Sequence, residues 1–248
     1  MAGISGLSAY ASYYREYSAG WAKTISRDLD IGFHGKLIFG KANGITTRSR
    51  NSLYTDPAAF DLTLESKLRF NISSPMSLQF NPDGLVGGME VNQSVPEILF
   101  NRENIGVAVD AGFIKTPSDD VTWSGSVIDL GFVCWKTNPY HYEHDGGFFY
   151  DGPLGDTLIY SNYSDNIYSE ASDELNANWE QKNYIAFMAP RIYLGYQKKI
   201  NNILSWSATG AAKVYRYKII PGLTVGLDAK FTKNIAGAVS FSYLEPFV

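Results

Sequence analysis

The sequence predicts an all-β protein whose long antiparallel strands form a transmembrane β-barrel. Three observations support this: apolar residues recur at every second position, the alternating stretches are long, and the chain is rich in Tyr, Phe and Gly. Soluble antiparallel sheets also alternate, so strand length is the stronger criterion. A tilted strand needs roughly 9 to 11 residues to cross a bilayer, whereas globular strands usually have about 5 or 6.

The stretch 60–72 shows the alternation most clearly and has thirteen residues. One face carries Phe60, Leu62, Leu64, Leu68, Phe70 and Ile72, and the other carries Asp61, Thr63, Glu65, Lys67, Arg69 and Asn71. We expect the apolar face to contact lipid. The interleaved charges of the second face are expected to compensate one another in the barrel lumen rather than to act in catalysis.

The same alternation of apolar and polar residues recurs along the chain and predicts about nine long strands. In order, they cover 13–25, 29–40, 60–72, 105–114, 121–135, 184–198, 204–217, 219–232 and 235–243. A turn at Thr232, Lys233 and Asn234 joins the last two into a hairpin. The intervening positions hold Gly, Ala, Ser, Thr and single charges, which suit a crowded or watery barrel interior. We expect one domain covering residues 1–248.

Two segments interrupt the rhythm. The first, 73–104, is rich in Pro and Gly and is expected to be irregular. Within it, Ser94 and Glu97 have the spacing of a capping box before an apolar run, so we expect a short helix there. Such a helix could lie in a barrel mouth or lumen. The other interpretation is a helical turn in a connection between strands.

The second segment, 136–184, is predicted to be a long acidic, aromatic loop on the outer side of the barrel. It holds nine acidic residues against Lys136 and Lys182, together with ten aromatic residues. Exposed aromatic side chains are costly unless something covers them. The candidate residues for binding a ligand or partner are therefore Tyr140, Tyr142, Phe148, Phe149 and Tyr150.

Composition excludes several classes of protein. A formal charge of -4 argues against a nucleic-acid surface. The chain has no run of about 18 apolar residues, so no transmembrane helix is predicted. Cys134 is the single cysteine and is interpreted as a small apolar strand residue.

Motifs of enzyme chemistry are nearly missing from the sequence, so we predict a non-enzymatic protein without a cofactor or metal. His141 and His144 flank Glu143, but the spacing indicates no third ligand and a solvated loop is the preferred interpretation. The Asp and Gly residues of 145–156 could hold calcium, although they lack the ligand periodicity of a dedicated loop. The chain has neither a nucleophile elbow nor a phosphate-binding glycine loop.

One hairpin gives the sequence a family resemblance. The stretch from Asn104 to Phe113, the turn at 116–120 and the stretch from Trp123 to Phe132 with Trp135 resemble a hairpin of Bacteroidota outer-membrane barrel proteins. Those proteins form a family of unknown function related to FadL-like fatty-acid transporters and PorV-like secretion barrels. The resemblance implies an outer-membrane location, a larger barrel and a signal peptide.

The first seven residues lack the basic start and apolar stretch of an export signal. We therefore expect the chain to be an internal portion of a longer barrel, truncated at both ends. The predicted function is transport of a small or apolar solute, or surface docking in a secretion-associated role. Expected partners are outer-membrane lipid and an apolar ligand, a carbohydrate or a surface protein, but no nucleic acid. The alternative is a soluble β-sandwich that binds carbohydrate or protein.

Overall fold

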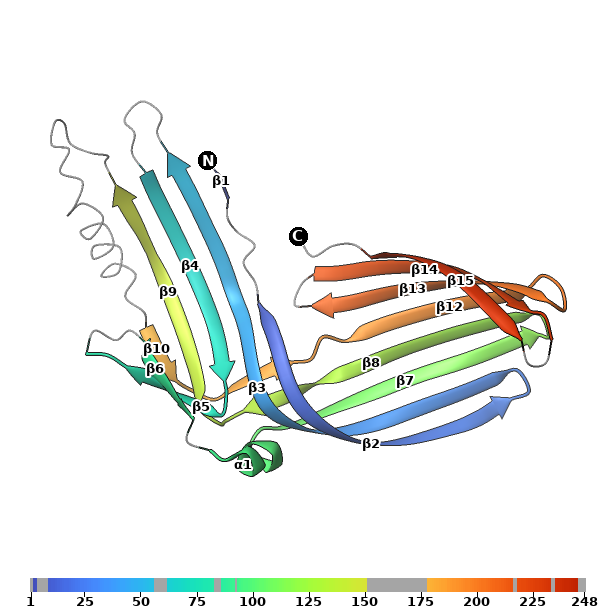
Figure 1. The fold of residues 1–248 in the computed structure, drawn as a ribbon, viewed down its shortest axis with the longest axis horizontal. Coiled ribbons are helices and arrows are strands. Elements are labelled where there is room, and N and C mark those ends of the chain that lie inside the picture. The colour runs from blue at the N-terminus through green and yellow to red at the C-terminus, as the bar shows by residue number, and fades with distance from the viewer. Residues whose placement is uncertain are drawn as a thin grey trace. The chain divides into compact units, whose positions relative to one another are not determined.

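A computed structural model describes residues 2–3, 9–55, 62–82, 86–91, 93–150, 178–215, 218–232 and 235–244 (Figure 1). Strands make up most of these residues, which confirms the prediction of an all-β, antiparallel protein. The strands are β1 (Ala2–Gly3), β2 (Tyr10–Ser26), β3 (Leu29–Thr55), β4 (Leu62–Ser73), β5 (Met76–Phe80), β6 (Val86–Val91), β7 (Ile105–Ser118), β8 (Val121–Trp135), β9 (Pro139–Tyr150), β10 (Asn178–Gln181), β11 (Tyr184–Phe187), β12 (Arg191–Lys199), β13 (Leu204–Tyr215), β14 (Lys218–Lys230) and β15 (Ala236–Leu244).

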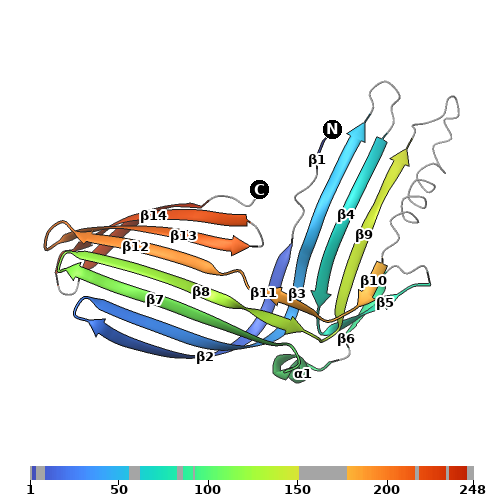
Figure 2. The ribbon, with the colours of Figure 1, turned by 180° about the vertical axis from the view of Figure 1, so that it is seen from behind.

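Most strands belong to one sheet of 13 strands. Its main path runs β10-β9-β4-β3-β7-β8-β12-β13-β14-β15, while β1 and β2 pair with β3, and β11 pairs with β8 (Figure 2). A second sheet consists of the hairpin β5-β6. Within the described residues, β10 and β15 end the main path, and no pairing closes this sheet into a barrel.

Contacts group the chain into two compact units. Unit 1 contains residues 1–15, 39–104 and 134–185, and unit 2 contains residues 16–38, 105–133 and 186–248. Unit 2 therefore holds most of β2, the first part of β3, nearly all of β8, and β7 and β12–β15. Unit 1 holds the rest of β3, with β4–β6, β9, β10 and α1 (Val95–Phe100).

In unit 2 the observed strands agree closely with the sequence pattern. The predicted hairpin near the C-terminus is confirmed, with Val225 opposite Phe241. The predicted strand 184–198 is split into β11 and β12, because Pro190 interrupts it and has no N–H for a ladder hydrogen bond. Residues 216–217, at the end of another predicted strand, lie outside the described residues.

In unit 1 the prediction of a continuous loop over 136–184 is wrong in part. Residues 139–150 form β9, which pairs along its whole length with β4, and 178–181 form β10. Glu143 and Asp145 resemble loop residues in the sequence, but here they lie on one face of β9, directly across from Arg69 and Lys67 of β4. Residues 151–177 lie outside the described residues.

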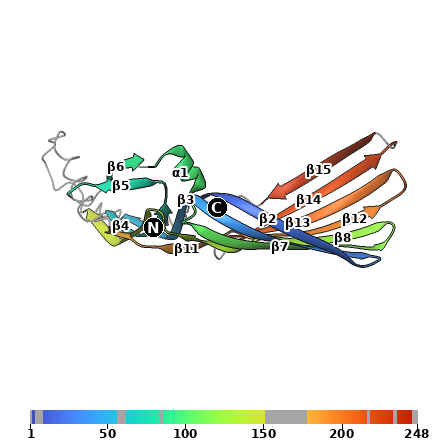
Figure 3. The ribbon, with the colours of Figure 1, turned by 90° about the horizontal axis from the view of Figure 1, so that it is seen from below.

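The segment 73–104 is more regular than expected. It contains the β5-β6 hairpin and then α1, which begins after Ser94 with Pro96 in its first turn (Figure 3). The Ser94 N–H donates to Glu97 Oε2 at 2.7 Å, so the predicted capping box is confirmed. The strand predicted to end at Gly40 continues in β3 to Thr55.

The core of unit 1 contains a polar residue at its centre. Asn104 is fully buried, and its Oδ1 accepts the N–H groups of Lys136 and Thr137 at 2.7 and 2.9 Å. Its Nδ2 donates to the carbonyl oxygen of Gly40. The buried ring of Trp135 lies over Gly40, where an added Cβ would be 2.5 Å from the ring.

Candidate functional site

The strands of unit 2 carry two chemically different faces. One row across five strands contains Trp123, Tyr196, Ala208, Val225 and Phe241, and the adjacent row contains Ser124, Gly195, Thr209, Thr224 and Ser242. The first row belongs to the apolar face and the second to the polar face. This segregation follows from the two-residue period of a strand.

Large side chains of the apolar face are exposed. Leu194 is 62% exposed, Val225 46% and Phe241 75%. Trp21 and Phe33 continue this face on β2 and β3, with their rings stacked 6.4 Å apart. A contiguous exposed apolar surface indicates contact with a membrane or another protein.

Charges gather on the polar face of unit 2, from four neighbouring strands. Lys36 of β3 lies at the centre, its Nζ 2.9 Å from Asp110 Oδ2 of β7 and 2.7 Å from Asp129 Oδ1 of β8. Arg191 of β12 binds the other oxygen of Asp129. The side chains of Lys36 and Asp129 are only 10% and 9% exposed. These four residues, the charge cluster, comprise two cations and two carboxylates, and Glu16 Oε1 of β2 lies 3.7 Å from Lys36 Nζ at its margin.

A β-bulge in β8 turns Asp129 toward this cluster. The pairing of β7 with β8 jumps from Val109–Leu130 to Ala111–Val127. Asp129 takes a φ of 61°, which Asp adopts more readily than most residues. Its N–H donates to Asp110 Oδ1 at 2.8 Å. The bulge thus redirects one side chain, a common use of bulges at functional sites.

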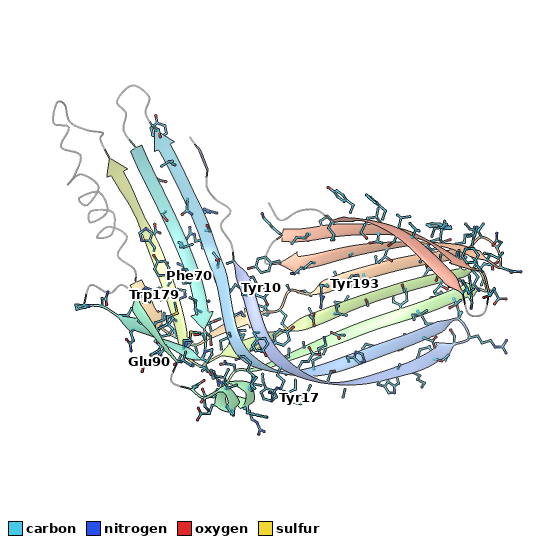
Figure 4. All side chains as sticks on the ribbon, in the orientation of Figure 1. Tyr10, Tyr17, Phe70, Glu90, Trp179 and Tyr193 are labelled. Atoms are coloured by element: carbon cyan, nitrogen blue, oxygen red, sulfur yellow. The ribbon has the colours of Figure 1, made fainter. Side chains whose placement is uncertain are left out.

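Beside the charge cluster, a hollow of about 790 Å³ opens in unit 2. The His34 ring lies over Gly20, where an added Cβ would be 1.9 Å from His34 Cδ2. His34 Nδ1 is 3.8 Å from Asp110 Oδ2. Further lining residues include Ile114, Ser124, Ser126 and Tyr193, of which Figure 4 labels the last. The hollow has the size and the mixture of apolar walls and few polar groups that small-molecule sites show.

The aromatic residues chosen from the sequence lie in unit 1 and pack against one another. Trp179 of β10 has its ring centroid 5.0 Å from Tyr142 and 5.4 Å from Phe70 (Figure 4). Phe80 and Tyr140 complete this aromatic cluster, each within 6.4 Å of Trp179.

The expected exposure of these aromatic side chains is wrong for Tyr140. Tyr140 is 7% exposed, and its hydroxyl accepts the Leu78 N–H at 3.2 Å. The two rings Tyr140 and Phe80 thereby hold the β5-β6 hairpin against β9. The side chains of the other three candidates, Phe148, Phe149 and Tyr150, lie outside the described residues, although their backbone belongs to β9.

On its other face, the β4-β9 pair carries a ladder of polar side chains. Arg69 pairs with Glu143 and Lys67 with Asp145, directly across the strands. The Arg69 guanidinium holds the pKa of Glu143 below its usual range, and the Lys67 ammonium does the same for Asp145. The prediction that the charges of 60–72 compensate one another is therefore wrong in its partners, because Lys67 and Arg69 pair with acids of β9, far away in sequence.

The same strand geometry separates the two histidines considered as metal ligands. His141 lies on the polar side near Glu143, whereas His144 is buried opposite Leu68 on the other side. Within the residues that the structure covers, no three His, Cys, Asp or Glu side chains form a metal site. Of the segment considered for calcium, only 145–150 is described.

The charge cluster was not selected by the sequence analysis. The two-residue alternation alone places Lys36, Asp110 and Arg191 at polar positions of three predicted strands. Their proximity depends on the strand order β3-β7-β8-β12, which no local pattern encodes. The bulge that adds Asp129 also has no clear local signal.

Replacing Trp179 by alanine is expected to lower the free energy of unfolding by about 2 kcal/mol. The half-buried indole contacts four other rings, and truncation of large aromatic residues removes both burial and ring contacts. A denaturant titration measures the change. Tyr54→Ala, at a half-exposed position of β3, serves as the control and should change stability by about 1 kcal/mol or less. Equal losses in both variants would contradict a packing role for the aromatic cluster.

The sequence was compared with protein-family models, with curated proteins and with solved structures. In the described part of the chain, no helix has the length and apolar character needed to cross a membrane. Searches of curated proteins and of solved structures gave no match. A family model described as a family of unknown function, DUF5723, matches residues 2–246. Since the match covers nearly the whole sequence, the chain belongs to the DUF5723 family.

Proposed function

We propose that unit 2 forms the wall of a transmembrane β-barrel in the outer membrane of a Gram-negative bacterium and that the barrel takes a small solute into its interior. The supporting observation is the segregation of faces in unit 2. Exposed Val225 and Phe241 point away from the charged and hydroxyl-bearing face. Lipid would cover the first face, and the second would line the lumen.

Strand lengths in unit 2 agree with this proposal. β7 has 14 residues, β8 15, β13 12 and β14 13. Roughly 9 to 11 residues are sufficient to cross a bilayer. Lys23 and Lys198 occupy apolar-face positions near strand ends, where their long side chains can reach the lipid headgroups.

The two free edges of unit 2 are compatible with closure. Its long strands follow the order β2-β3-β7-β8-β12-β13-β14-β15, which makes eight, and neighbours run in opposite directions (Figure 1). β2 and β15 consequently run antiparallel to one another. An even number of antiparallel strands is typical of bacterial barrels, and closure would satisfy the unpaired edges that lipid does not tolerate.

The hollow supports a transport or solute-binding role for the lumen. It adjoins the charge cluster, and half of its lining residues are Gly, Ala, Ser or Thr, which leave room for a guest. This role requires neither a catalytic step nor a cofactor. The resemblance of residues 104–135 to hairpins of outer-membrane barrels favours the same location.

The alternative, a soluble β-sandwich, needs a second sheet over the apolar face of unit 2. The second sheet among the described residues is the two-stranded β5-β6 hairpin, which belongs to unit 1. No observation on the described strands therefore favours the sandwich.

Two neighbouring arginine substitutions test the proposal. Val225→Arg places a charge on the apolar face, and Thr224→Arg places it one residue away on the polar face. In lipid-facing positions arginine costs about 2–4 kcal/mol near the bilayer centre. We expect Val225→Arg to fold poorly into phosphatidylcholine vesicles, while Thr224→Arg folds nearly as well as the unaltered chain. The readout is the heat-dependent mobility shift of folded barrels on a denaturing gel.

The result that would overturn the proposal is equally definite. If the chain folds in buffer without lipid or detergent, and if both arginine variants behave alike, the apolar face does not contact lipid. A soluble binding module would then become the better account.

A further inference from the structure

Helix α1 presents an uncovered apolar surface. Val95 is 69% exposed, Phe100 62% and Leu99 37%. No residue of this helix is buried, although four of its six residues are large and apolar. A helix this short gains little from intrinsic propensity, so its contacts must hold it in place.

Unit 1 fixes α1 at both ends. At the start, Ser94 and Glu97 form the capping box. At the end, the Lys41 ammonium donates to the carbonyl oxygen of Asn101, the C-cap residue, at 2.6 Å. Lys41 is 4% exposed, and burial lowers its pKa, with Arg15 lowering it further. Burying the Lys41 ammonium costs desolvation free energy. Its hydrogen bond to the carbonyl oxygen of Asn101 offsets part of this cost and ties the end of α1 to β3.

Arg15 connects the exposed ring of α1 to β2. Its guanidinium carbon lies 4.8 Å from the centre of the Phe100 ring. Among the described residues Arg15 forms no ion pair with a carboxylate. A partly exposed cation thus lies directly beside an exposed aromatic side chain.

The arrangement favours a lipid surface as the occupant. On β2, Arg15 is an even number of residues away from Tyr17 and Trp21. The exposed side chains of Tyr17 and Trp21 belong to the apolar face of unit 2. The surface itself is small and amphipathic, with the Arg15 guanidinium beside the exposed Phe100 ring. Aromatic residues and arginine beside apolar residues are characteristic of the membrane interface.

We propose that α1 is an interfacial membrane element, in which Val95, Leu99 and Phe100 enter the headgroup region and Arg15 binds a lipid phosphate. This inference rests on the proposed barrel function of unit 2. The energetic basis is burial of a small apolar surface, supplemented by attraction between Arg15 and anionic lipid.

Spin-label accessibility tests the depth of α1. Cys134 is replaced by serine, and a nitroxide is attached to Phe100→Cys, with Val225→Cys and Asp120→Cys as references for the barrel wall and for the β7-β8 turn. In phosphatidylcholine/phosphatidylglycerol vesicles, the ratio of oxygen to nickel-chelate accessibility should be highest at 225 and lowest at 120. We expect an intermediate ratio at 100, several-fold above that at 120.

The phosphate contact has its own test. Raising the fraction of phosphatidylglycerol should move the label at 100 deeper, and Arg15→Gln should remove this dependence. The same dependence in the presence and absence of Arg15 would overturn the phosphate assignment.

Failure of this inference can be told apart from failure of the barrel proposal. An aqueous label at 100 together with a lipid-exposed label at 225 overturns the inference alone, as does a label at 100 shielded from both reagents by a protein partner. Aqueous labels at both positions overturn the barrel as well.

Discussion

Replacing Asn104 by alanine is expected to lower the free energy of unfolding by about 3–5 kcal/mol. The side chain is fully buried and satisfies the N–H groups of Lys136 and Thr137 and the carbonyl of Gly40. Each buried polar group left without a partner costs about 1–3 kcal/mol. Because Asn104 is the last residue before β7, its loss would also loosen the start of that strand. Denaturant titration in detergent micelles measures the change.

Asn201 provides a matched control for this prediction. Its Oδ1 also accepts two backbone N–H groups, those of Ile203 and Leu204, at 2.9 and 2.8 Å. Asn201 is exposed in the turn after β12, so water can replace its hydrogen bonds. We expect Asn201→Ala to cost about 1 kcal/mol. A loss as large as that of Asn104→Ala would show that burial is not the source of the difference.

Lys36→Met should destabilise the protein by about 3–5 kcal/mol, the usual penalty for removing one partner of a buried ion pair. The substitution preserves the apolar stem but leaves Asp110 and Asp129 facing each other without their central cation. Arg191 still neutralises Asp129, whereas Asp110 loses its nearest cation. The same denaturant titration detects the loss.

The control for Lys36 is Lys67, which forms an ion pair of similar length with Asp145, 2.8 Å. Here both side chains are about half exposed, and exposed pairs contribute about 0–1 kcal/mol. Lys67→Met is therefore expected to have little effect. If both substitutions cost the same, the charge cluster is more solvated than its burial indicates.

The sequence was sufficient to predict the strands of unit 2, because apolar residues mark one face along most of each strand, even though the bulge at Asp129 shifts that face in β8. It was insufficient for β3 beyond Gly40. There, Lys41 and Asn43 are buried, with their polar atoms bonded to Asn101 and Ala11. Polar residues satisfied by distant partners break the alternation without breaking the strand.

The candidate site was predicted less well, for a related reason. Tyr140 and Tyr142 were expected to be exposed, yet their ring contacts come from Phe80 and Trp179, which are far away in sequence. Likewise, Glu143 and Asp145 suggested a solvated loop because their cationic partners lie on β4. Local composition records charge and aromaticity but not the partner across the sheet.

The bulge at Asp129 shifts the alternation of side chains between the two faces of β8 by one residue. Before it, odd-numbered residues such as Trp123 point to the apolar side; after it, even-numbered Leu130 and Phe132 are exposed there instead. Trp135 consequently faces the interior, where it covers Gly40. Deleting Asp129, the extra residue, would leave a regular strand in which Leu130 still faces the apolar side and Trp135 the interior, whereas a deletion of two residues would invert everything downstream and move the indole to the outside. Between Trp123 and Trp135, β8 should thus tolerate the loss of one residue at the bulge better than the loss of two.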